Sequence, residues 1–162
     1  MNYTSSSGAV VVSGTPSGAA SGTYNYSILA MFAPTSDTTA SATISGAISI
    51  AATTASSTFS IDVTATNSSN YTLSGTDRNG SVSGSDPDLI FNVDDTINFV
   101  VSASGHPFYL KTVAGTGTGN TISGITNNGS ESATITWKPS STGTFYYQCS
   151  LHGGMVGTIT IQ

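Results

Sequence analysis

The chain has 162 residues and a mass of 16.3 kDa, a length sufficient for one hydrophobic core and a smaller appended module. Only 7% of the residues are charged, about a third are Ser or Thr and 18 are Gly, a composition that favours short strands and turns and excludes a fold of long helices. The net charge of -5 with only three basic residues excludes nucleic acid as a partner, because no basic stripe is available to neutralise phosphates.

Residues 1–69 form the first predicted region, which contains only two charged residues, Asp37 and Asp62. Alternating apolar runs predict about four strands, at residues 10–12, 22–32, 44–50 and 59–63. Four strands are too few for a self-sufficient sandwich, so we expect an incomplete β module that packs on the second region or on neighbouring chains. The alternative interpretation is a flexible Ser/Thr-rich linker.

The sequence predicts neither a membrane span nor an export signal. No stretch approaches the roughly 18 consecutive apolar residues of a membrane span, and the first residues lack the basic and apolar regions of an export signal. We therefore expect no membrane span.

Residues 70–162 form the second predicted region, in which larger apolar residues alternate regularly with polar ones. The inward-facing sets are Leu89, Phe91 and Val93; Ile97, Phe99 and Val101; Phe108 and Leu110; Ala133, Ile135 and Trp137; Phe145 and Tyr147; and Ile159 and Ile161. With residues 71–75 and 121–125 they make eight strands, and turn residues such as Asn79-Gly80 and Asn128-Gly129 fall between them. The pattern predicts an all-β, antiparallel Greek-key sandwich.

The residues most informative about function lie in the segment YYQCSLHGGMVG. Cys149 has the inward parity of Tyr147, Met155 has the inward parity of Ile159, and His152 lies at the apex of the loop between them. A second histidine, His106, shares the inward parity of Phe108. A thiolate, two imidazoles and a thioether can thus meet at one pole of the sandwich.

This donor set selects copper. Two imidazoles and a thiolate with a weak axial thioether give a trigonal copper site, whereas zinc accepts the first three ligands and has no use for the methionine. Cys149 is the only cysteine and His106 and His152 are the only histidines, so the spacing C-x2-H-x2-M with an upstream histidine makes coincidence improbable.

Residues 70–162 also resemble a known family, the cupredoxins or blue copper proteins. The segments LIFNVDDTINFVV, GHPFYL and GTFYYQCSLHGGMVGTITI are similar to their early hairpin, first-histidine strand and ligand loop, and the loop spacing is closer to that of amicyanin than to that of plastocyanin. The resemblance implies a cupredoxin-like sandwich in which His106, Cys149, His152 and Met155 are the copper ligands, and it adds the Gly105 carbonyl as a weak candidate.

Two departures from the family pattern bear on the site and its setting. Pro107 stands where many cupredoxins have an asparagine, and it has no N–H to donate to the Cys149 sulfur. A cupredoxin-like region that follows a Ser/Thr-rich β extension, without an export signal, also resembles the cupredoxin-like domains within structural proteins of marine bacteriophages. This looser resemblance rests on the segments NYTLSGTDRNG, SGHPFYLKT and YYQCSLHGGMVG. That resemblance implies a virion or an extracellular, cell-surface location, and assembly into a homo-oligomer or larger virion structure through residues 1–69.

Two functional interpretations follow from these features. Four protein ligands leave no open position for a substrate, so we expect no enzyme activity and predict one-electron transfer, with a redox partner protein docking near the His152 imidazole edge. The alternative is a purely structural virion or fibre protein whose site is silent or in which the metal only stabilises the fold.

Overall fold

The computed structural model describes residues 2–6, 9–13, 21–32, 40–50 and 55–162, and every regular element among them is a β-strand. The chain divides into two compact units, Met1–Thr54 and Ala55–Gln162. None of the described residues belongs to a helix with the length and hydropathy needed to cross a bilayer. The all-β class predicted from the composition and alternation is confirmed.

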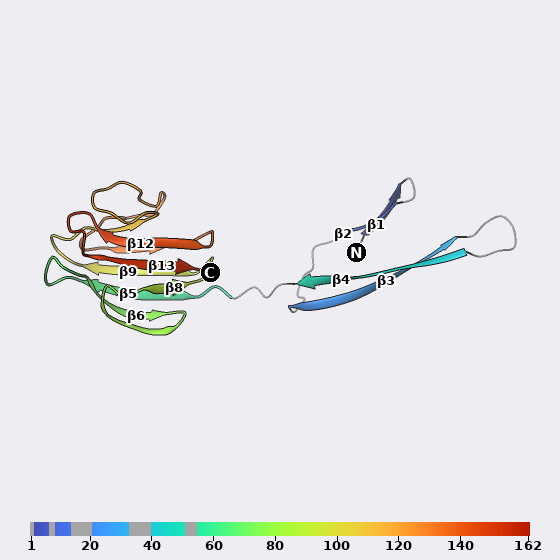
Figure 1. Cartoon of the computed structure of the whole chain (residues 1–162), viewed down its shortest axis with the longest axis horizontal. Coiled ribbons are helices and arrows are strands. Elements are labelled where there is room, and N and C mark those ends of the chain that lie inside the picture. Colours follow the sequence, from blue (N-terminus) through green and yellow to red (C-terminus); the bar gives the residue numbers. More distant parts are fainter. Residues whose placement is uncertain (1, 7–8, 14–20, 33–39, 51–54) are drawn as a thin grey trace. The chain divides into compact units, whose positions relative to one another are not determined.

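The second unit is a sandwich of two sheets (Figure 1). One sheet has the strand order β10-β12-β13-β8 and the other β11-β9-β5-β6-β7. Their bounds are β5 Thr58–Thr64, β6 Thr72–Asp77, β7 Gly80–Ser85, β8 Leu89–Phe91, β9 Thr96–Ser102, β10 Phe108–Lys111, β11 Thr134–Trp137, β12 Gly143–Cys149 and β13 Val156–Ile161. From β8 to β12 each strand lies in the opposite sheet from the strand before it, as expected of the crossing connections in a Greek-key sandwich.

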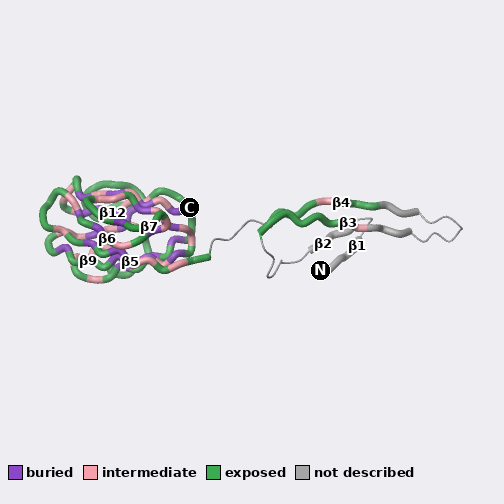
Figure 2. The backbone as a smooth tube through the Cα atoms, turned by 90° about the horizontal axis from the view of Figure 1, so that it is seen from below, coloured by how far each residue is buried: buried purple, intermediate pink, exposed green. Residues whose placement is uncertain are grey.

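The core of this unit lies between the two sheets, as the buried segments in Figure 2 show. Most of the residues predicted to face inward are fully or nearly fully buried, and Val93 and Phe145 are partly buried against them. Phe108 lies at the centre of an aromatic cluster, with ring centroids 5.1 Å from Tyr71, 5.3 Å from Phe99 and 5.4 Å from Tyr147. Burial of such rings supplies the main stabilisation of the sandwich.

The boundary between the units lies at Thr54/Ala55, whereas the sequence placed it after residue 69. The difference is β5, which pairs with β9 on one side and with β6 on the other and is therefore the central strand of its sheet. Its alternating Ile61 and Val63 are fully buried in the core of the second unit. Alternation identified the strand but does not say which sheet it joins.

Three further details of the second unit differ from the expectation. Residues 121–125 form turns rather than a strand, with a single bridge from Thr121 to Lys111. Conversely, β7 is a strand that the pattern missed, because Val82 is its only buried residue. Two strand pairs, β5 with β9 and β13 with β8, are parallel rather than antiparallel.

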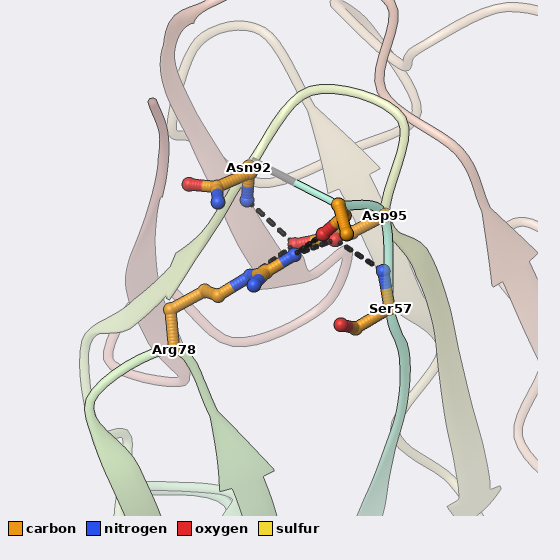
Figure 3. A network of polar contacts seen from close by, with 5 residues as sticks. Ser57, Arg78, Asn92 and Asp95 are labelled. Carbon is orange, nitrogen blue, oxygen red and sulfur yellow. Dashed lines mark hydrogen bonds and ion pairs between the residues drawn. The ribbon is translucent and has the colours of Figure 1, made fainter. Parts of the chain in front are cut away.

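A buried polar network fixes the end of β9 that lies away from His106 (Figure 3). The carboxylate of Asp95 is fully buried, forms an ion pair with Arg78 and accepts hydrogen bonds from the backbone N–H groups of Asn92 (2.7 Å) and Ser57 (2.9 Å). Burial raises the pKa of Asp95, but the hydrogen bonds from Arg78, Asn92 and Ser57 outweigh burial, so its pKa is lowered overall. The network joins the starts of β5 and β9.

The first unit contains two hairpins among its described residues, β1 (Asn2–Ser6) with β2 (Ala9–Ser13) and β3 (Gly22–Phe32) with β4 (Ala40–Ile50). The four predicted strands of residues 1–69 are β2 to β5, and β1 is additional. In the β3–β4 hairpin, Tyr24 pairs with Ile48. The part of the hairpin whose burial is described is mostly exposed (Figure 2). Its exposed large apolar residues are Tyr24, Tyr26, Ile44 and Ile48.

Candidate metal centre

The ligand loop is a tight connection between two paired strands. Cys149 is the last residue of β12, and β13 begins at Val156. The backbone N–H of Cys149 donates to the carbonyl of Met155 (3.0 Å), and the N–H of Met155 donates to the carbonyl of His152 (3.3 Å). These bonds close the loop on itself and bring its apex back over the end of β12.

His106 reaches the same pole from the neighbouring strand of that sheet. It follows a turn closed by its own N–H donating to the Ala103 carbonyl (2.9 Å), in which Gly105 has a φ of 77° that favours glycine. Phe108, two residues later, is the register partner of Cys149 in the antiparallel pair β10–β12. Because the two strands run in opposite directions, the segment before Phe108 lies beside the segment after Cys149.

Three of the predicted ligands meet at this pole. The Nδ1 atoms of His106 and His152 are 3.2 Å apart, and the Sγ of Cys149 is 3.6 Å from Nδ1 of His152. One donor atom from each of these residues lies within 4.8 Å of the others. Nitrogen donors at roughly 2.0–2.1 Å and a sulfur donor at roughly 2.3 Å from one ion lie roughly 3.3–3.8 Å from one another in a tetrahedral or trigonal site. The group therefore fits a single metal ion.

Met155, the fourth predicted ligand, is fully buried at the end of the same loop. Its backbone closes the loop, and its thioether remains a predicted ligand. The Gly105 carbonyl likewise remains a prediction, while the N–H of Gly105 is bound to the carboxylate of Glu131 (2.7 Å). Glu131 thus supports the turn that presents His106.

The cysteine sulfur has a backbone donor although Pro107 offers none. The N–H of Leu151 lies 3.5 Å from Sγ of Cys149. Pro107 contributes its carbonyl instead, which accepts a hydrogen bond from the N–H of Ser150 (3.3 Å). This bond joins the His106 segment directly to the ligand loop.

Tyr71 supports the His106 segment from inside the core, a role that its place in a predicted strand did not reveal. Its single hydroxyl hydrogen is shared between the carbonyls of His106 (O···O 3.0 Å) and Pro107 (3.1 Å), and its side chain is fully buried. The pKa of Tyr71 is raised well above its usual range, chiefly by burial and further by a hydrogen bond and charge interaction with Cys149. The hydroxyl therefore stays protonated and remains a donor.

Gln148 is a second supporting residue that was not predicted. Its parity, opposite to that of Tyr147 and Cys149, suggests a solvent-facing side chain, yet it is only 1% exposed. Its side-chain amide donates to the carbonyls of Cys149, His152 and Met155 at 3.0–3.1 Å. A buried amide next to the cysteine is a signal that only the structure supplies.

The rim of the centre is partly open to solvent. His106 and His152 are half-buried, Cys149 is fully buried, and Leu151 beside His152 is 62% exposed. The sulfur is therefore shielded from water while the imidazoles lie near the surface.

Comparison with known proteins finds similar solved structures. No protein-family model and no curated protein matches the chain. A structure of the copper protein rusticyanin shares 20% identity over 65% of this chain and 78% of its own, with a TM-score of 0.45. Rusticyanin from Thiobacillus ferrooxidans shares 18% identity over 67% of this chain and 79% of its own, with a TM-score of 0.45. A point mutant of amicyanin in its oxidised state shares 22% identity over 47% of this chain and 70% of its own, with a TM-score of 0.34.

Proposed function

We propose that the second unit binds one copper ion through His106, Cys149, His152 and Met155. The observation that carries the proposal is the meeting of two imidazole nitrogens and one thiol sulfur within 4.8 Å. Two nitrogens and a thiolate, with a soft thioether at the end of the same loop, form the donor set that selects copper. Zinc also accepts the first three donors but gains nothing from a buried thioether.

The same residues support one-electron transfer as the activity. Bound copper supplies a couple between Cu(II) and Cu(I). The four donors leave no position for a substrate. The hydrogen-bonded loop holds three of them, and the turn before β10 holds His106, which disfavours a large change of geometry between oxidation states. The half-buried His152, next to the exposed Leu151, is the point where we expect a redox partner protein to approach.

The test is an absorption spectrum with metal analysis after Cu(II) is added to the full chain, compared with Cys149→Ala. We expect the wild type to take up one equivalent of copper and to show an intense visible band, because thiolate-to-Cu(II) charge transfer needs the cysteine sulfur. The variant should lose the band. Ser150→Ala, beside the cysteine but outside the predicted donor set, is the matched control and should keep it. A colourless wild type, or an unchanged band in Cys149→Ala, would refute the proposal.

We propose in addition that the first unit mediates self-assembly, as a surface or virion setting would require. The supporting observation is the set of four large apolar side chains exposed on the β3–β4 hairpin, of which Ile44 is 60% and Ile48 52% exposed. A two-stranded hairpin is at best marginally stable alone in water, so such residues favour association. The test is the mass in solution of the full chain and of a chain beginning at Ala55. We expect the full chain to form oligomers and the shorter chain to be a monomer. A monomer mass for both chains would exclude the proposal. The virion setting itself stays a prediction from composition and resemblance.

A further inference from the structure

Gln148 lies directly before Cys149 in β12, opposite Tyr109 of β10 and Val156 of β13. Its side chain is 1% exposed, although glutamine is mostly found at the surface of proteins. The amide nitrogen Nε2 lies 3.1 Å from the carbonyl oxygen of Cys149, 3.0 Å from that of His152 and 3.1 Å from that of Met155. All three acceptors belong to predicted metal ligands of the one loop.

The orientation of the amide follows from these neighbours. With the nitrogen toward the loop, two N–H groups serve three carbonyls, one of them through a shared bond. With the amide reversed, its oxygen would face three carbonyl oxygens at hydrogen-bond distance, which is repulsive. The carbonyls of His152 and Met155 each accept a backbone bond as well, which their two lone pairs allow.

The loop has a particular need for such a bond network. It contains Gly153 and Gly154, both exposed, and glycine loses more conformational freedom on ordering than any other residue. Backbone hydrogen bonds from the N–H groups of Cys149, Met155 and Val156 lie within the loop, and two more join Ser150 to Pro107 and to Gly117. The amide of Gln148 adds bonds at the start, the apex and the end of the loop.

We propose that Gln148 is a positioning residue that holds the ligand loop in its metal-binding conformation before metal arrives. One amide ties together the backbones of Cys149, His152 and Met155, so that their side chains need not be ordered when metal binds. This inference deepens the proposed copper function, on which its metal-binding part rests. Its part concerning the metal-free loop stands independently.

Hydrogen exchange of the metal-free full chain tests the loop directly. Gln148→Met keeps the length and burial of the side chain but removes the donors, and Gln148→Asn keeps the amide but draws it back by one methylene. We expect amides in residues 150–155 to exchange roughly tenfold faster in both variants. Each hydrogen bond from the Gln148 amide stabilises the closed loop modestly, so the loop opens more often when these bonds are lost. Amides in β9 should be unchanged, and Gln162→Met, at an exposed position, should behave as the wild type.

Copper affinity, measured well below the unfolding temperature, gives the second readout. Loss of an outer-shell hydrogen bond typically weakens metal binding roughly 10–100-fold, and we expect this range for Gln148→Met and none for Gln162→Met. If Gln148 only stabilises the fold, Gln148→Met should lower thermal stability without changing copper affinity, and exchange should speed up in β9 as much as in the loop. Either result overturns the inference. Failure of both Gln148→Met and Gln148→Asn to fold would overturn it as well. If the wild type binds no copper, the proposed function fails, while loop exchange still decides the role of Gln148.

Discussion

Removal of one hydroxyl beneath the metal centre, in Tyr71→Phe, separates support of the site from support of the fold. The ring is fully buried and packs against Phe108 at 5.1 Å, so phenylalanine fills the same space. The hydroxyl, however, donates to the carbonyls of His106 and Pro107 at 3.0 and 3.1 Å. Its removal leaves both carbonyls without this donor.

The magnitude follows from the cost of losing a buried donor. A buried polar group left without its partner costs about 1–3 kcal/mol, so we expect Tyr71→Phe to lower the free energy of unfolding by that amount. For a domain of this size each kcal/mol corresponds to about 4–8 °C in Tm. The two carbonyls belong to His106 and to the next residue, Pro107, so the hydroxyl helps to hold the His106 backbone in place. We therefore also expect a roughly tenfold or greater loss of copper affinity, as is typical when a hydrogen bond that supports a metal ligand is lost.

The matched control is Tyr147→Phe. Tyr147 is also fully buried, and its hydroxyl donates to the carbonyl of Pro87 at 2.8 Å, a residue outside the predicted donor set. Thermal unfolding of the two metal-free variants should therefore give similar losses of Tm, while copper titration should show weakened binding for Tyr71→Phe alone. Equal copper affinities in the two variants would refute the assignment of Tyr71 to the site.

The buried ion pair and the domain boundary give two more predictions. Asp95→Asn should lower the free energy of unfolding by about 2 kcal/mol at neutral pH, because hydrogen bonds to an ionised acceptor are lost. The pKa of Asp95 in the folded protein is lowered from 3.8, so the stabilisation by its carboxylate is complete above pH 3.8 and is lost as the pH falls through the folded pKa. The unfolding free energies of wild type and Asp95→Asn, measured against pH, should therefore converge below pH 3.8. A constant difference between the two curves would contradict this. A chain beginning at Ala55 should fold and bind copper, whereas one beginning at Asn70 lacks the central strand β5 and should not fold, by circular dichroism; a folded shorter chain would restore the boundary after residue 69.

Local patterns in the sequence were enough to predict most strands and the candidate ligands of the second unit. Side chains of a strand point alternately to its two faces, so the parity of Phe99, Phe108 and Tyr147 predicted their burial without any knowledge of their partners. The same parity, with the spacing of Cys149, His152 and Met155, placed the candidate donors at one pole. His106 joined them because it shares the parity of Phe108.

The pairing of the strands and the support of the site depend on how the whole chain folds. Strand pairing is a contact between distant segments, so local alternation could not assign β5 to the second unit or reveal its parallel pairing with β9. Tyr71 lies 35 residues before His106, and its hydroxyl meets that backbone only after the sheets pack. Gln148 has the parity of a surface residue and is buried because its amide binds the loop that folds back over it; such three-dimensional hydrogen bonds leave no periodic trace in a sequence.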